Sequence, residues 1–187
     1  MAITFLAIVL MSGWNAVPIA RATGTVALVD LSDSAAAANW VTVNDPVMGG
    51  RSTSAVSFNG GLVFSGTISL ENNGGFASAR GPFDPEIGSK ATGATALRVR
   101  ATGDGKTYLL KVETGQPWSY IQRFSTEAGM RRTYDLPIGD FQPVGRFLDP
   151  VSAPPLDPSA INRVAFYILD KQEGAFQLIV GGIDASS

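Results

Sequence analysis

The stretch A-L-R-V-R-A-T-G-D-G-K-T-Y-L-L-K-V-E, residues 96–113, decides the fold class because its side chains alternate in character with a period of two. Leu97 and Val99 are apolar, whereas the residues on either side of Val99 are arginines. Successive side chains of a β-strand point to opposite faces, so this alternation predicts two strands. Glycine tolerates positive φ, and Gly103-Asp104-Gly105 therefore predicts a tight hairpin between them.

The same period extends over most of the chain, with frequent glycine, proline, asparagine and aspartate breaks. The strand candidates are Val26–Leu31, Ala55–Phe58, Leu62–Ser65, Thr67–Leu70, Phe76–Arg80, Ala96–Ala101, Lys106–Glu113, Ser119–Ser125, Arg131–Leu136, Arg163–Leu169 and Phe176–Ile183. A second hairpin is expected at Asn59-Gly60-Gly61. Ser34–Ala38 is expected to form only a helical turn, and the proline-rich segment Pro143–Pro158 an irregular surface connection. We therefore predict an all-β fold, a two-sheet sandwich or a barrel.

Two of these strands, V-A-F-Y-I-L from Val164 and F-Q-L-I-V from Phe176, are apolar on nearly both faces and are predicted to lie in the middle of the sandwich. If three other strands, residues 96–101, 106–113 and 119–125, are neighbours, their charged side chains share one surface. Those residues are Arg98, Arg100, Lys111, Glu113 and Arg123. Such a surface is either a solvated face held by cross-strand ion pairs or a cationic groove for an acidic or polyhydroxyl ligand.

Composition excludes several classes of function. The 187 residues include no cysteine and no histidine, which excludes thiolate or imidazole metal sites, Ser-His-Asp and Cys-His catalysis, and disulfide chemistry. The 14 Lys and Arg against 16 Asp and Glu give a formal net charge of −2, and no run of basic residues is present. We therefore expect no nucleic-acid partner, and no cofactor.

The N-terminus has the pattern of a targeting signal. An apolar run, Ala2–Met11, is too short to cross a bilayer and is followed by the small-residue triplet Ala20-Arg21-Ala22. This predicts a signal peptide over residues 1–22 and a single β-sandwich domain over residues 23–187, exported to the periplasm or outside the cell. No later apolar run reaches spanning length, so no stable membrane insertion is expected after signal removal.

Two loops carry residues that strand periodicity does not explain: N-D-P-V-M-G-G-R-S, residues 44–52, and the glycine-bordered run N-N-G-G-F-A-S-A-R, residues 72–80. We expect them to meet at one rim of the sandwich and to present binding groups there. The candidate residues are Asn44, Asp45, Met48, Arg51, Ser52, Asn72, Asn73, Phe76 and Arg80. The structural alternative is that the loops pack on each other, with Arg51 or Arg80 bonding loop carbonyls.

Four motifs in the chain resemble the complex I intermediate-associated protein 30 family. They are N-D-P-V-M-G-G-R-S from Asn44, F-S-G-T-I-S-L-E-N-N-G-G-F-A-S-A-R from Phe64, L-R-V-R-A-T-G-D-G from Leu97 and D-K-Q-E-G-A-F from Asp170. The resemblance implies a jelly-roll β-sandwich like the galactose-binding domains. It also implies an assembly-factor or chaperone-like role toward a protein partner. The sequence departs from the common family pattern near Met130 and from Gly145 to Pro158.

The leading hypothesis is thus a non-catalytic binding module that recognises a protein through the two loops. The first alternative is a carbohydrate-binding module, in which Trp118 and Tyr120 would form an aromatic platform beside Gln122 and Arg123. The second is a glycoside hydrolase or lyase. Its candidate carboxylates are Asp45, Glu71, Glu113 and Asp170. A calcium ion held by Asp45, Asp140 or Asp170 is a further alternative.

Overall fold

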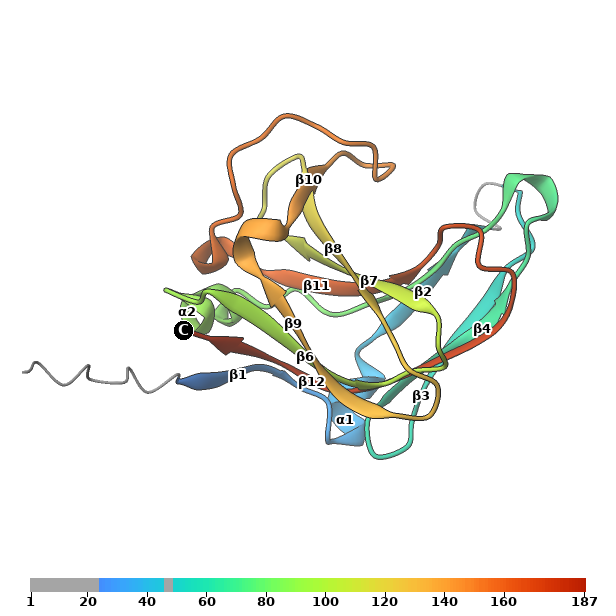
Figure 1. Cartoon of the computed structure of the whole chain (residues 1–187), viewed down its shortest axis with the longest axis horizontal. Helices are drawn as coiled ribbons and strands as arrows, with labels where there is room; N and C mark the ends of the chain where they lie inside the picture. The colour runs from blue at the N-terminus through green and yellow to red at the C-terminus, as the bar shows by residue number, and fades with distance from the viewer. Residues whose placement is uncertain (1–23, 46–48) are drawn as a thin grey trace, which may run out of the picture.

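Two six-stranded antiparallel sheets pack face to face in the computed structural model, which describes residues 24–45 and 49–187 (Figure 1). Sheet A has the order β3-β4-β12-β6-β9, and β1 also pairs with β12. Its strands are β1 (Thr25–Asp30), β3 (Thr53–Phe58), β4 (Leu62–Ile68), β6 (Ala96–Thr102), β9 (Arg131–Pro137) and β12 (Gly174–Ser186). The all-β sandwich that the sequence predicts is confirmed.

Sheet B has the order β10-β8-β7-β11-β5-β2. Its strands are β2 (Val41–Asn44), β5 (Ala77–Arg80), β7 (Thr107–Glu113), β8 (Ser119–Ser125), β10 (Gln142–Val144) and β11 (Arg163–Ile168). The inner faces of both sheets form one hydrophobic core, to which Phe64, Leu97, Leu110 and Phe166 contribute. The two strands that are apolar on both faces occupy interior positions, as predicted: β11 lies between β7 and β5, and β12 between β4 and β6.

The predicted hairpin at Gly103-Asp104-Gly105 is wrong, because β6 belongs to sheet A and β7 to sheet B. The segment carries the chain across the edge of the sandwich instead. A Cβ at Gly103 would lie 2.2 Å from the Thr126 side chain, and Gly105 has a φ of +91°. Glycine is therefore needed here because the chain passes close to Thr126, not because it forms a hairpin. The hairpin predicted at Asn59-Gly60-Gly61 is confirmed and joins β3 to β4.

The same crossing divides the single polar surface that the sequence suggested. Arg98 and Arg100 lie on the outer face of sheet A, where they form ion pairs with Asp135 and Asp184. The other three residues lie on sheet B, where β7 and β8 are direct neighbours. They are Lys111, Glu113 and Arg123. Only this second group can contribute to one ligand site on the outer face of sheet B.

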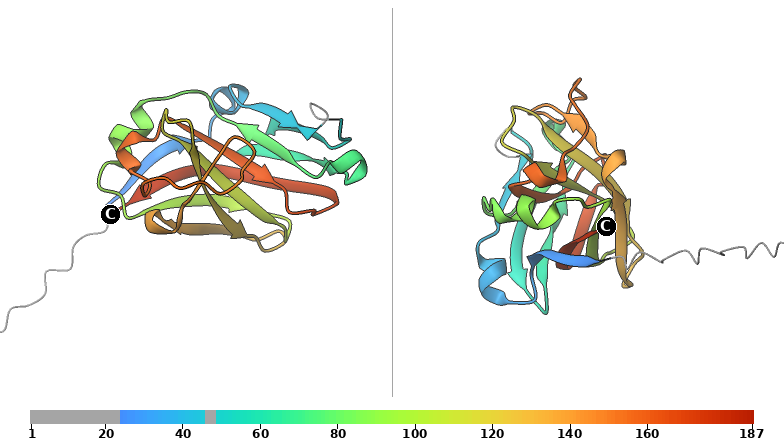
Figure 2. Two further views of the ribbon diagram at one scale, coloured as in Figure 1. Left: turned by 90° about the horizontal axis from the view of Figure 1, so that it is seen from above. Right: turned by 90° about the vertical axis from the view of Figure 1, so that its left-hand side faces the viewer.

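Several elements differ from the sequence prediction. The strands β2 and β10 were not expected, and the two segments expected at 62–65 and 67–70 form the single strand β4. Helix α1 (Ser34–Ala38) occurs where a helical turn was expected, whereas α2 (Glu86–Ala91) was not expected. The short 3-10 helices are Glu71–Asn73, Ile138–Asp140 and Pro158–Ala160. Helix α2 packs beside the last of these at one end of the sandwich (Figure 2).

Two sequence predictions cannot be compared with this fold. The expected signal peptide, residues 1–22, and the candidate residue Met48 lie outside the described residues. Within the part of the chain that the structure describes, no helix is long and apolar enough to span a membrane.

Candidate functional site

The two glycine-rich loops meet at one rim of the sandwich, and the carboxylate of Asp45 joins them. Asp45 is 1% exposed and accepts hydrogen bonds from the backbone N–H groups of Ser52 (2.8 Å), Gly75 (2.6 Å) and Phe76 (3.2 Å). The Ser52 hydroxyl donates a further bond of 2.5 Å to the same carboxylate. We call this arrangement the Asp45 clasp.

The clasp favours an ionised carboxylate. Burial opposes ionisation of Asp45, but the bonds donated by Ser52, Gly75 and Phe76 together outweigh it and hold the pKa of that carboxyl below its ordinary value. The Ser52 hydroxyl also accepts a bond from the Ser69 N–H at 3.0 Å. Both polar side chains of the clasp are thus buried and satisfied, which makes them part of the fold.

The clasp also explains one glycine of each motif. A Cβ on Gly50 would lie 2.4 Å from Cγ of Asp45, and a Cβ on Gly74 would lie 2.7 Å from its Oδ2. No side chain fits at either position without displacing the carboxylate. The loops therefore pack on each other, as the structural alternative required. The guanidinium of Arg51 pairs instead with Glu71 at 2.9 Å, and it bonds no loop carbonyl among the described residues.

The remaining loop candidates lie at different depths. Asn72 and Asn73 are exposed at the rim, and the Asn72 amide donates to the Gly49 carbonyl at 3.2 Å. Asn44 is half-buried, and its amide is hydrogen-bonded to the Ser54 hydroxyl. Phe76 and Arg80 are half-buried and face a groove on sheet B. The structure thus brings these two, but not the exposed rim residues, to a concave surface.

That groove lies on the outer face of sheet B and has a volume of about 940 Å³. It crosses the sheet from β2 to β8, and one wall is the connection that follows β10, which arches over the sheet in Figure 1. We call it the cationic groove. The residues that give it its chemistry are Arg80, Lys111, Arg123, Arg146, Phe147 and Tyr167.

Tyr167 forms the centre of the groove floor. On β11 it pairs with Leu109 of β7 on one side and Ser78 of β5 on the other. Two cations lie over its ring, with Cζ of Arg80 5.6 Å and Nζ of Lys111 5.9 Å from the ring centroid. The floor therefore combines an aromatic ring with positive charge in a fixed geometry.

The cations of the groove are unequally neutralised. Nζ of Lys111 is 3.1 Å from the Glu113 carboxylate. Arg123 binds both oxygens of Asp170, at 2.8 and 3.0 Å. Arg80 and Arg146 form no ion pair with any described residue. Nε of Arg80 donates to the Ser78 hydroxyl at 3.2 Å, which fixes the base of its guanidinium.

The wall is held against the sheet by an apolar contact. Leu148 packs on a small buried cluster on the outer face, made by Leu109, Ile121, Val144, Ala165 and Tyr167. The neighbouring Phe147 is 77% exposed. The loop thus uses one apolar side chain as an anchor and presents an aromatic one beside the groove. The sequence signal for this wall is a phenylalanine within a proline-rich connection, and Phe147 was not among the predicted site residues.

Trp118 does not line the groove. Its indole N–H donates to the Tyr120 hydroxyl at 2.9 Å, and that hydroxyl donates to the Pro154 carbonyl. Trp118 packs against the core, and Tyr120 is buried within it. This placement gives neither ring the open face that a sugar platform requires.

The candidate carboxylates are engaged with other groups. Asp45 belongs to the clasp, Glu71 pairs with Arg51, and Asp170 pairs with Arg123. Of the described residues that line the groove, only Glu113 carries a carboxylate. The described residues contain no group of three or more side chains suited to hold a metal ion.

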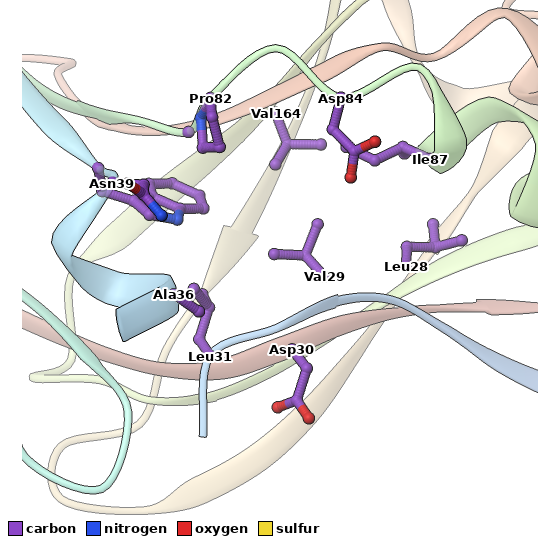
Figure 3. Close-up of a pocket in the computed structure, with 12 residues that line it drawn as sticks. Leu28, Val29, Asp30, Leu31, Ala36, Asn39, Pro82, Asp84, Ile87 and Val164 are labelled. Carbon is purple, nitrogen blue, oxygen red and sulfur yellow. The ribbon is translucent and has the colours of Figure 1, made fainter. Parts of the chain in front are cut away.

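A second cavity lies between the edges of the two sheets (Figure 3). Leu28, Val29 and Ile87 contribute to its mainly apolar lining, Asp84 points into it, and Asp30 points away on the far side of β1. Its volume is about 210 Å³. Ligand pockets are usually about 300–1,000 Å³, so the cationic groove is the better candidate site.

Comparison with solved structures identifies the same fold in carbohydrate-binding modules. The family 11 module of the cellulosomal cellulase Lic26A-Cel5E of Clostridium thermocellum is 15% identical, with a TM-score of 0.62 over 88% of this chain and 95% of that one. The family 11 module from Clostridium thermocellum, in complex with a β-1,3-1,4-mixed-linked tetrasaccharide, is 15% identical and has a TM-score of 0.59, covering 88% and 96%.

An agarase, AgWH50C, contains a similar region, 15% identical with a TM-score of 0.58, which covers 88% of this chain but 25% of the agarase. At this identity the likenesses show the fold alone. No curated protein matches the sequence significantly. The model of one protein family, described as complex I intermediate-associated protein 30, matches residues 29–180, which include both rim loops and nearly all of the sandwich. The chain therefore belongs to the complex I intermediate-associated protein 30 family.

Proposed function

We propose that this protein is a non-catalytic binding module and that the cationic groove holds a polysaccharide chain. The observation that carries the proposal is an open groove of about 940 Å³, lined by four Lys and Arg side chains and bordered by the exposed ring of Phe147. Aromatic faces stack on the C–H faces of sugars, while arginine and lysine bond their hydroxyls.

The position of the groove on a sheet face favours a glycan over an added peptide strand. The central strands β7, β11 and β5 are paired on both sides, so their main-chain groups are already bonded to one another. A peptide that binds by strand addition needs a free sheet edge. Recognition on the face falls to side chains, which suits a sugar chain. The carbohydrate-binding modules that share this fold support the same proposal.

The chemistry of the groove favours binding over hydrolysis. Glycoside hydrolysis uses two carboxyl groups, roughly 5–9.5 Å apart on either side of the scissile bond. Glu113 is the only carboxylate among the described groove residues, and it lies between Lys111 and Arg163, with Oε2 3.5 Å from Nη1 of the latter. The signal peptide expected over residues 1–22 would export the protein. Outside the cytoplasm it would meet the polysaccharides of cell surfaces.

The test is polysaccharide retention by the variant Phe147→Ala. Burial of this ring against a ligand is worth roughly 1.5–3 kcal/mol, so affinity should fall about 10-fold or more. Phe83→Ala is a matched control, since Phe83 is 60% exposed but does not line the groove. Affinity electrophoresis in gels that contain a panel of polysaccharides measures both variants. Failure to retain any polysaccharide, or equal retention by Phe147→Ala and the wild type, would contradict the proposal.

A second candidate is a protein partner bound at the rim, as the description of the family suggests. The exposed residues Arg51, Glu71, Asn72 and Asn73 favour it, because they form a polar surface beside the rigid clasp. A rim partner identified by mass spectrometry after co-purification should be lost from Arg51→Ala and kept by Phe147→Ala, with unchanged melting temperatures. The reverse pattern would assign that partner to the groove.

A further inference from the structure

We infer that the cationic groove selects an anionic polysaccharide, one whose sugars carry carboxylate or sulfate groups; this inference rests on the proposed function. The chain as a whole has a formal charge of −2. The groove is nevertheless lined by four Lys and Arg side chains, Arg80, Lys111, Arg123 and Arg146, and by one carboxylate, Glu113. Positive charge is therefore concentrated in the groove, although the net charge of the whole chain is negative.

The guanidinium of Arg80 is positioned for an anion. Its Nε is held by the Ser78 hydroxyl, and its Cζ lies over the Tyr167 ring. The two terminal nitrogens of Arg80 make no hydrogen bond or ion pair with any residue that the structure describes. A guanidinium that is fixed at its base and unbound at its fork matches the two oxygens of a carboxylate or sulfate.

Arg146 provides a second unpaired guanidinium in the groove, and its Cζ lies 5.9 Å from the centroid of the Phe147 ring. It comes from the loop after β10, whereas Arg80 comes from β5. Like Arg80, Arg146 has no carboxylate partner in the described part of the chain. A polymer that repeats its charge along the chain can pair with both unpaired arginines, and we therefore assign the groove to a polyanionic glycan rather than to a single acidic sugar.

Lys111 and Arg123 contribute differently. Each already has a carboxylate partner, Glu113 and Asp170 respectively. Their partners lower the charge that they present and keep their side chains in place. The selective contacts with an anionic substituent are thus assigned to Arg80 and Arg146. Variants of these two residues should therefore lower the affinity for an acidic polysaccharide.

The experiment measures binding of the full chain to three polymers by isothermal titration calorimetry at low ionic strength. The polymers are polygalacturonate, which carries carboxylates, a sulfated galactan, and a neutral mixed-linked β-glucan. At least one acidic polymer should bind about tenfold more tightly than the neutral one, and its affinity should fall as salt is added. The two acidic arms distinguish carboxylate from sulfate.

Arg80→Gln and Arg146→Gln should each weaken binding of the acidic polymer about fivefold to tenfold and weaken binding of the neutral polymer less. Arg51→Gln is the matched control, because this arginine is exposed at the rim outside the groove. Arg146 is exposed, so its variant keeps the test valid if Arg80→Gln fails to fold.

The outcomes separate this inference from the proposed function. Equal affinity for neutral and acidic polymers overturns the inference and leaves the groove as a polysaccharide site. An equal loss of acidic binding in Arg51→Gln and the two groove variants also overturns it, since general charge would then explain the attraction. Absence of binding to all three polymers and to the wider panel contradicts the proposed function itself.

Discussion

Replacing Asp45 by asparagine should destabilise the protein severely although it preserves the size of the side chain. Oδ2 accepts three hydrogen bonds and Oδ1 accepts one, all from groups that act as donors in the clasp. An asparagine amide must direct its NH₂ group at a donor, whichever way it is turned. At least one buried N–H then loses its partner, and the other bonds lose a charged acceptor.

The size of the effect follows from these contacts. An unsatisfied buried donor costs roughly 1–3 kcal/mol, and exchange of a charged for a neutral acceptor costs about 1 kcal/mol per bond. Because such terms are not additive, we expect a loss of about 3–5 kcal/mol in the free energy of unfolding. For a chain of this length that lowers the melting temperature by roughly 6–20 °C.

Thermal and urea unfolding followed by far-UV circular dichroism measure this loss at pH 7. The control is Asp135→Asn, which removes the exposed ion pair between Arg98 and Asp135 and should cost no more than about 1 kcal/mol. A loss below about 1 kcal/mol for Asp45→Asn would show that the clasp does not hold the rim together.

Acid provides a second measurement on the same variant. The pKa of Asp45 is lowered in the folded protein, so its ionisation stabilises the fold above the ordinary carboxyl pKa of 3.8. This stabilisation is lost as the pH falls below 3.8 toward the folded-state pKa. The difference between the wild type and Asp45→Asn should therefore shrink over that interval, and a difference that stays constant would refute the assignment of the charge to the clasp.

Three further variants test other contacts. Gly50→Ala should destabilise the protein by about 2–4 kcal/mol in urea unfolding because its Cβ would lie 2.4 Å from Asp45, whereas Gly139→Ala, with open space around it, should change stability by less than about 0.5 kcal/mol. Gln172→Glu should cost about 2–3 kcal/mol, because its amide donates to two main-chain carbonyls and a carboxylate cannot; recovery of full stability in a thermal melt would argue against this. Trp118→Phe should lower the melting temperature by a few degrees, yet retain wild-type polysaccharide affinity, because Trp118 faces the core.

The architecture was predictable where side chains alternate or where a strand is apolar on both faces. The alternation of β6, β7 and β8 gave their bounds to within a residue or two, and the apolar strands β11 and β12 lie at interior positions as expected. The strands β2 and β10 have four and three residues, which is too short for a period to be recognised. Turn residues such as Gly103 showed that the chain turns but could not show which sheet it enters.

The site was predictable only in part. The sequence drew attention to the two loops that form the rim, but Asp45 bonds Gly75 across 30 positions of sequence, and its burial depends on that distant contact. Phe76 and Arg80 were proposed for their place in an unusual strand, and they do border the groove. Arg146 and Phe147 were missed because they belong to an irregular loop, where no periodicity indicates which way a side chain points.

The alternation in β7 has an evolutionary consequence. Tyr108, Leu110 and Val112 fill the interior, while Lys111 and Glu113 between and beside them border the cationic groove. These two outward positions can therefore be exchanged without repacking the inward ones. Single substitutions at these two positions can change the chemistry of the groove, under separate selection from those that keep the protein folded. Sandwiches of this kind are accordingly suited to diversify in specificity while their architecture stays the same.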